Sequence, residues 1–394
     1  MREAVIVSAA RTAIGAFEGS LSSFSAPELG AIAIKNAVQR ANIQIDEINE
    51  VIMGCVIQAG LGQNPARQAA LKAGLPNTVE CFTVNKVCGS GLKAVMLAAQ
   101  AIQCGDADII VAGGMENMTR APYLIDKMRS GGRMGNIPVS DAMILDGLWE
   151  AYHNMHMGNT ADEVAKKYNV SREDQDNYAF LSYQRAKESI EKGYFKDEIC
   201  EVLVPQKKGE PKKFLVDEIY RETSLESLKA LKPAFSKDGT VTAGNASKIS
   251  DGASAVVIMA KEKALELGIK PMAKVVAQCA GAWEPMWVLV APIKSIPKCL
   301  KKAGLEEKDI AFHEINDAFA ASSIAVVREL GINPEKVNVR GSAISLGHPI
   351  GASGARVLTT LLYILRDKGG KYGMASLCLG GGEAVSMIIE NLME

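Results

Sequence analysis

The sequence of 394 residues lacks the patterns that mark metal sites, redox centres and membrane spans. Its four histidines include no H-E-x-x-H pair, and its eight cysteines include no C-x-x-C pair. Zinc sites and thiol redox centres commonly show these spacings, so we expect no metal. No apolar run approaches the roughly 20 residues that a membrane-spanning helix needs. The sequence therefore predicts neither a metalloenzyme nor a membrane protein.

An excess of charge of one sign is also absent. The 44 basic residues nearly balance the 45 acidic ones, giving a net charge of -1. The densest basic stretch, KKGEPKK at 207–213, is short and typical of a solvated loop. We therefore expect no nucleic-acid partner. The first residues are typical of a core strand rather than a signal peptide, and the last carry no lipidation or peroxisomal signal. A cytoplasmic location with reduced cysteines is the expectation.

What the sequence does contain is a regular alternation of two kinds of run. Over residues 1–117, short β-branched stretches such as EAVIVSA at 3–9 alternate with helical ones such as GLKAVMLAAQAIQCG at 91–105. Strands that alternate with helices indicate an α/β fold with a largely parallel sheet. ADIIVAGG at 107–114 is apolar on both faces, as a strand covered on both sides should be.

Residues 118–249 are more polar and lack this alternation, so we interpret them as an inserted loop domain. The insertion contains a long predicted helix, with Ser171 as its cap and Asp174 three residues later. The alternation resumes at residue 250. The predicted units are therefore an N-terminal half at 1–117 that is completed by 250–270, and a C-terminal half at 271–394.

The two halves repeat one plan. KVCGSGLKAVMLAAQAIQCGDADIIVAGG begins near Cys88, and GHPIGASGARVLTTLLYILRDKGGKYGMASLCLGGG begins near His348. Each has a reactive residue, then small residues, an apolar helix, a polar turn and a strand that ends in glycines. Corresponding strand ends brought together are the usual place for a site in α/β proteins.

Cys88 lies between a strand and a helix, where unpaired N–H groups and the helix dipole favour the nucleophilic thiolate. Three more residues lie at comparable strand ends: His348, Asn316 and Cys378. Singly, each has a structural alternative. Cys88 could be a small buried residue, His348 a hydrogen-bonded core histidine, Asn316 a helix cap and Cys378 a strand residue of the core. Together they offer a nucleophile, a general base, an amide donor and a second thiol.

Seven strings carry a resemblance over almost the whole chain: NKVCGSG, GGMENMTRAPY, HMGNTADE, KPAFSKDGTVTAGNAS, NDAFAA, GHPIGASGAR and CLGGG. Their order is similar to that of the thiolases, and in particular of the biosynthetic acetyl-CoA acetyltransferases. The resemblance implies the thiolase fold, in which two similar βαβ-rich halves pack as a five-layered α-β-α-β-α core with an inserted loop domain. It also implies a homotetramer built from tight dimers.

The resemblance further implies the reversible condensation of two acetyl-CoA molecules into acetoacetyl-CoA and CoA through an acetyl-cysteine. Cys88 would carry the acetyl group, His348 would take its proton, and Cys378 would move the α-proton. One oxyanion would bind His348 and a water on Asn316, and the other the N–H groups of Cys88 and Gly380. Coenzyme A thioesters are substrates, so no cofactor is implied.

The resemblance implies that six residues of this chain contact the CoA thioester: Met157, Arg221, Phe235, Ala243, Ser247 and Phe319. For Arg221 a solvated arginine is the alternative, because its loop is one residue shorter than the common pattern. VLVAPIKS at 288–295 departs from the family, where a methionine helps to close the acyl pocket. Val288 is shorter, which predicts a roomier pocket, whereas the direction of Leu289 is open. Glu383 and Ala384 also depart, replacing an uncharged residue and glycine.

Three alternatives remain within related classes. A degradative 3-ketoacyl-CoA thiolase would run the same chemistry on longer acyl chains. A non-catalytic, lipid-binding relative is disfavoured because Cys88, His348, Cys378 and Asn316 are all present. A condensing ketoacyl synthase is disfavoured because CLGGG supplies a second cysteine.

Overall fold

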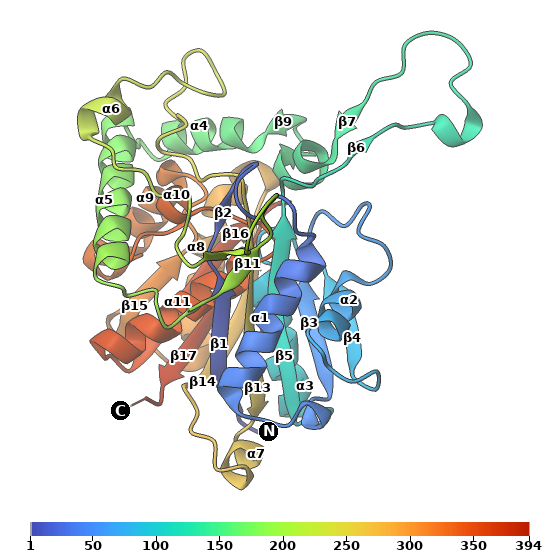
Figure 1. The fold of residues 1–394 in the computed structure, drawn as a ribbon. Helices are drawn as coiled ribbons and strands as arrows, with labels where there is room; N and C mark the ends of the chain where they lie inside the picture. The colour runs from blue at the N-terminus through green and yellow to red at the C-terminus, as the bar shows by residue number, and fades with distance from the viewer. Residues whose placement is uncertain (1, 394) are drawn as a thin grey trace.

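A large mixed β-sheet forms the centre of the computed structural model, which describes residues 2–393 (Figure 1). Its main strands lie in the order β15-β16-β17-β14-β1-β13-β5-β3-β4, and two short strands, β2 and β10, pair with β13 and β1. The bounds are β1 (Ala4–Thr12), β2 (Gly15–Ala16), β3 (Glu50–Gly54), β4 (Glu80–Val84), β5 (Ile109–Asn117), β10 (Ile199–Cys200), β13 (Ser250–Ala260), β14 (Ala273–Ala282), β15 (Ile310–Ile315), β16 (Tyr372–Leu379) and β17 (Glu383–Asn391).

The expectation of a largely parallel sheet is wrong. Parallel pairing is confined to β3 with β4 and β5, β15 with β16, and β1 with β10. The ladders that join β1, β13, β5, β14, β17 and β16 in the middle of the sheet are antiparallel. For β16 and β17 the reason is connectivity, because three glycines join these strands directly and a hairpin makes its strands antiparallel. Strands buried on both faces have the same apolar composition in either pairing.

The two halves of the sheet share one strand order. The order β3-β5-β13-β1 of the N-terminal part corresponds to β15-β16-β17-β14 of the C-terminal part, and β4 is an additional edge strand beside β3. They meet where β1 pairs with β14 over two residues of each strand, Val5 opposite Lys274 and Ile6 opposite Ala273. Helices α3 and α11 pack against each other, and α11 contacts β5 and β13 of one part and β15 and β16 of the other. The turns that precede these two helices are thereby brought together.

Caps in the sequence set where several helices begin. Ser25 and Glu28 form a capping box at the start of α1, and Ser171 and Asp174 form the predicted one at the start of α5, which confirms that prediction. The helices are α1 (Ala26–Ala41), α2 (Pro65–Lys72), α3 (Ser90–Cys104), α4 (Met157–Lys167), α5 (Arg172–Glu191), α6 (Leu225–Lys229), α7 (Lys261–Glu266), α8 (Pro292–Ala303), α9 (Ala320–Leu330), α10 (Ala343–Leu346) and α11 (Ser353–Lys368).

Contrary to the expectation that no run is long enough, the stretch Val87–Cys104 is long and apolar enough to cross a membrane by length and composition alone. It contains α3, whose residues Leu92, Val95 and Ile102 are buried in a core cluster shared with α11 and strands of both halves. A helix enclosed in this way is a core helix, because its apolar surface is already covered by protein.

The segment between β5 and β13 lies largely over one end of the sheet (Figure 1). Its helices α4 and α5 contact α9 of the C-terminal half. Apart from β10, its short strands pair locally: β6 (Tyr123–Leu124) with β7 (Ser140–Asp141), β8 (Trp149–Glu150) with β9 (Met155–His156), and β11 (Val202–Val204) with β12 (Lys212–Phe214). The chain between β6 and β7 extends away from the body as an arm (Figure 1).

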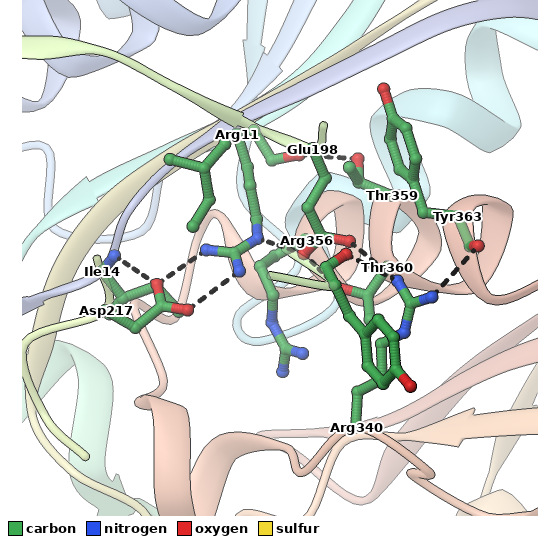
Figure 2. A network of polar contacts seen from close by, with 12 residues as sticks. Arg11, Ile14, Glu198, Asp217, Arg340, Arg356, Thr359, Thr360 and Tyr363 are labelled. Carbon is green, nitrogen blue, oxygen red and sulfur yellow. Dashed lines mark hydrogen bonds and ion pairs between the residues drawn. The ribbon is translucent and has the colours of Figure 1, made fainter. Parts of the chain in front are cut away.

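A buried network of charges holds this segment to both halves (Figure 2). The Arg11 guanidinium lies 2.6 Å from the Glu198 carboxylate and 2.7 Å from that of Asp217. Thr360 on α11 donates a hydrogen bond to Glu198 at 3.0 Å. Burial lowers the pKa of Arg11, but the two carboxylates raise it by more, so the guanidinium stays charged. Removing one partner of such a buried pair costs roughly 3–5 kcal/mol of folding free energy.

Candidate active site

A cavity of about 830 Å³ opens where the two halves and the inserted segment meet. Cys88, His348, Cys378 and Gly380 all line it. Their positions in the fold differ. Cys88 and His348 lie in the turns before α3 and α11, Cys378 is the penultimate residue of β16, and Gly380 begins the glycine turn before β17. The structure therefore brings together four of the five predicted catalytic residues in one lining.

The turn that presents Cys88 is fixed by its neighbours. The Asn85 side chain accepts a hydrogen bond from the N–H of Val87 at 3.0 Å. The Ser90 hydroxyl accepts from the N–H of Lys86 at 2.9 Å and donates to the carbonyl of Val87 at 2.6 Å. Val87 itself has a φ of 46°, a left-handed conformation that costs a β-branched residue of order 1–3 kcal/mol. The turn is thus held in a strained shape directly before the candidate nucleophile.

Burial of Cys88 opposes the predicted effect of the helix end, which favours the thiolate. Burial raises the pKa of Cys88 well above its usual range, and the nearby Cys378 raises it further. The backbone N–H groups of Cys88 and Gly380 bind the sulfur and lower the pKa, but they do not offset the burial. The sulfur therefore needs a base at the moment of attack, with two amides already facing it.

His348 is a neutral base in this site. Its Nδ1 lies 2.6 Å from the Ser353 hydroxyl, which donates to the carbonyl of Pro349 at 3.0 Å. Because that hydroxyl already donates, we assign the imidazole proton to Nδ1, which leaves a lone pair on Nε2. Burial lowers the pKa of His348 to about 3, and the positive charge of Arg356 adds to the effect. The hydrogen-bonded core position of His348 and a role as a base are therefore compatible.

Asn316 lies behind His348 rather than in the cavity lining. It is buried, directly follows β15, and places Nδ2 3.5 Å from His348 Nε2. Helix α9 begins at Ala320 with Phe319 as its cap, so the alternative that Asn316 caps the helix is wrong. Within residues 2–393, Asn316 Oδ1 is buried and has no hydrogen-bond partner. It can therefore accept a hydrogen bond from water or substrate.

Cys378 is a residue of strand β16 that lines the cavity. It pairs with Ala384 across the β16–β17 ladder and is almost completely buried. Burial raises the pKa of Cys378 to about 12, so this residue also rests as a thiol. The site thus holds two neutral thiols and one neutral imidazole.

The residues predicted to contact the CoA thioester all line the same cavity. They are Met157, Arg221, Phe235, Ala243, Ser247, Phe319 and, at the acyl end, Val288. Phe235 packs edge to face on Phe319, with ring centroids 6.2 Å apart, and stacks on His156 at 4.7 Å. His156 was not predicted, although it opens the HMGNTADE string. It accepts the N–H of Gly158 and so caps α4.

Val288 and Leu289 are both buried and both line the cavity. They belong to a short 3₁₀ segment, Pro285–Val290, between β14 and α8. The direction of Leu289, which the sequence left open, is therefore toward the cavity. Behind them, the Lys167 ammonium lies 3.6 Å from the ring centroid of Trp287. This cation–π contact supports the segment from outside.

Sequence reasoning also missed Glu116, which holds the turn that follows His348 by a hydrogen bond from Gly351. Its buried carboxylate accepts the N–H groups of Val56, Ile57 and Gly351 at 2.9–3.2 Å. Burial raises the pKa of Glu116 to about 7, although these N–H groups lower it in part. A useful signal was present in the sequence: a lone carboxylate at the end of an apolar strand needs partners.

Among residues 2–393, no group of three or more His, Cys, Asp or Glu side chains is placed to hold a metal ion.

Comparison with known proteins identifies the family of the chain. The family description "Thiolase, N-terminal domain" matches residues 4–262, and "Thiolase, C-terminal domain" matches residues 269–391. A protein of Escherichia coli (strain K12) named acetyl-CoA acetyltransferase is 54% identical over the full length of both chains. Proteins of the same name from Allochromatium vinosum and Cupriavidus necator are 52% and 51% identical, covering 98% and 99% of this chain and 99% and 100% of theirs. The chain belongs to the thiolase family.

Proposed function

We propose that this protein is an acetyl-CoA C-acetyltransferase, which condenses two acetyl-CoA molecules into acetoacetyl-CoA and CoA and also runs the reverse thiolysis. The observation that carries the proposal is that two cysteines, Cys88 and Cys378, line one cavity together with the His348 imidazole. One thiol can carry an acyl group while the other handles a proton. The names of the relatives support acetyl-CoA as the substrate.

In the first half of the reaction, His348 Nε2 takes the proton of Cys88 as the sulfur attacks the thioester carbonyl. The negative charge on the carbonyl oxygen is met by the N–H groups of Cys88 and Gly380. The bond from the carbonyl carbon to the CoA sulfur breaks, and Cys378 gives its proton to that sulfur. Acetyl-Cys88, free CoA, a Cys378 thiolate and a His348 imidazolium result.

In the second half, the Cys378 thiolate removes an α-proton from a second acetyl-CoA. The enolate oxygen is held by the His348 imidazolium and a water on Asn316. The enolate carbon attacks acetyl-Cys88, and a carbon–carbon bond forms as the carbon–sulfur bond breaks. His348 returns its proton to Cys88, and Cys378 keeps the α-proton. Both thiols and the imidazole are then neutral again, as in the resting structure.

The inserted domain, residues 118–249, supplies most of the proposed CoA contacts, with Phe319 and Val288 from the C-terminal half. Its cavity-facing members include Met157, Arg221, Phe235 and Ser247. The two halves, 1–117 with 250–270 and 271–394, would form the five-layered core. A second candidate function is a thiolase that also cleaves longer 3-ketoacyl-CoA thioesters, and the short side chain of Val288 favours it.

A homotetramer of tight dimers in the cytoplasm completes the proposal. Two exposed features support assembly. β4 is an edge strand of the sheet with partly exposed residues, and such edges commonly pair. The arm between β6 and β7 exposes apolar side chains, namely Tyr123, Ile125, Met128, Met134, Ile137 and Val139. Apolar surface of this kind usually marks an interface. Light scattering at micromolar concentration tests it, and a monomer mass would refute it.

Acylation by acetoacetyl-CoA tests the proposed function directly. We expect a gain of one acetyl mass per chain, located on the peptide that contains Cys88. The matched control is Cys104→Ala, which removes an exposed thiol outside the cavity and should leave the label unchanged. Label on a cysteine other than Cys88, or no label in the active protein, rejects the assignment.

A further inference from the structure

An ion pair joins the two turns that face each other across the candidate nucleophile. The Lys86 ammonium lies 2.6 Å from a carboxylate oxygen of Glu383. Lys86 is two residues before Cys88, and Glu383 is three residues after Gly380. The pair therefore connects the N-terminal half, which carries the thiol, to the C-terminal half, which carries the Gly380 amide. Both side chains remain partly exposed.

The turns at this point are packed with little free space. A Cβ on Gly89 would lie 2.5 Å from Leu379 Cδ2, and one on Gly380 would lie 3.2 Å from Val87 Cγ1. These contacts set how closely the two backbones approach. They do not by themselves stop the turns from sliding along each other, because they are apolar and undirected.

The glycine turn has few other restraints of its own. Gly381 and Gly382 adopt φ values of 89° and 86°, and glycine moves readily among such conformations. Glu383 is the first residue of β17 and pairs with Leu379 across the ladder, so its backbone is fixed at the far side of the turn. On the opposite side, the N–H of Trp283 donates to the carbonyl of Gly382 at 2.7 Å.

We propose that Lys86 and Glu383 are positioning residues, whose ion pair sets the position of the Gly380 amide relative to the Cys88 sulfur. This inference rests on the proposed function, since that amide stabilises the oxyanion formed at Cys88. An exposed ion pair contributes little to folding. Its contribution to the rate is larger because a displacement of about 1 Å in a catalytic group can cost up to 10²-fold.

Three variants test the pair: Glu383→Gln, Lys86→Met and the charge swap Lys86→Glu with Glu383→Lys. The measurements are kcat and KM for the condensation, the rate of acetylation of Cys88 and the melting temperature. We expect each single variant to lower kcat and the acetylation rate about tenfold, with KM for acetyl-CoA within about twofold. The charge swap should recover most of the lost kcat.

The matched control is Glu390→Gln at the far end of the same strand, where Glu390 lies 3.7 Å from Lys371. It should leave kcat unchanged. A second measurement needs no variant: raising the salt concentration to about 1 M screens exposed ion pairs and should lower the kcat of the wild type several-fold, but not that of Glu383→Gln.

Each outcome decides one of the two proposals. A wild type that transfers no acetyl group refutes the proposed function. An active wild type whose kcat is unchanged in Glu383→Gln and Lys86→Met, or whose kcat does not respond to salt, refutes the positioning role. A loss of kcat that the charge swap does not recover and that parallels a fall in melting temperature also refutes it, because a structural role would then suffice.

Discussion

The two halves of this chain place different chemical groups at matching points of one backbone plan. In the N-terminal half, the turn before α3 holds Cys88, and in the C-terminal half the turn before α11 holds His348. The two helices pack against each other, so the proposed nucleophile and its proposed base meet although about 260 residues separate them in the sequence. A duplicated plan thus provides two adjacent reactive positions, and divergence gives them complementary roles.

A second pair of residues occupies matching positions on β5 and β16, the strands that follow α3 and α11. The registers of the parallel ladders define it: Gly54 of β3 is opposite Gly114 of β5, and Ile315 of β15 is opposite Ser376 of β16. Two residues further on stand Glu116 in one half and Cys378 in the other. Glu116 is enclosed by N–H donors, whereas Cys378 faces the cavity. The same position holds a supporting carboxylate in one half and the proposed proton-transfer thiol in the other.

The largest effect should come from removing the reactive member of this second pair. We expect Cys378→Ala to accept acetyl on Cys88 but to lose condensation by roughly two to four decades, because no group then moves the α-proton. Separate assays of acetylation and condensation measure the two steps. Condensation near the wild-type rate would show that Cys378 is only a strand residue, and the contrast with Glu116 would disappear.

The substitution Glu116→Gln tests the supporting role of Glu116, the other residue of this pair. One amide group cannot accept all the N–H groups that the carboxylate now accepts, and each unpaired buried group costs about 1–3 kcal/mol. The expected result is a loss of unfolding free energy of this size together with a slower acetylation of Cys88, since Gly351 belongs to the His348 turn. Chemical denaturation and single-turnover labelling measure the two losses.

The pH dependence of this variant has a definite sign. The pKa of Glu116 is raised to about 7 in the folded protein, so protonation of Glu116 favours the folded state. Its contribution to stability is fully present below the ordinary glutamate pKa and is lost as the pH rises to about 7. Glutamine does not titrate. The deficit of Glu116→Gln relative to the wild type should therefore shrink between about pH 4.5 and 7, and a deficit that grows would contradict the assignment.

Sequence patterns predicted the reactive residues better than their surroundings. Cys88, His348 and Cys378 could be placed because strings of small residues around them mark turns and strand ends. The antiparallel centre of the sheet could not, because β13 enters between β1 and β5 after a long insertion. The protonation of Cys88 was also beyond reach, since it depends on burial by residues distant in sequence, and this burial outweighs the local effect of the helix end.

The smallest expected effect concerns a third pair of segments, those that follow the matching strands β1 and β14. Both line the cavity, with Phe17 exposed on one side and Val288 and Leu289 buried on the other. Val288 is shorter than the methionine of the family pattern, and Leu289 lines the cavity beside it. One methylene of contact changes discrimination by about 1–3 kcal/mol. We therefore expect 3-ketoacyl-CoA thioesters of five and six carbons to be cleaved, and Val288→Met to raise the preference for four carbons over six by one to two decades.

The measurement is kcat/KM for thioesters of four, five, six and eight carbons in the wild type and in Val288→Met. Phe17→Leu is the matched control, because a change at the exposed segment should leave the ratio of four to six carbons unaltered even if it weakens binding. An unchanged ratio in Val288→Met, or negligible cleavage of six carbons in both proteins, would mean that Leu289 has closed the pocket. The buried segment after β14 would then resemble the exposed one after β1 in having no control over acyl length, and the enzyme would be restricted to four carbons.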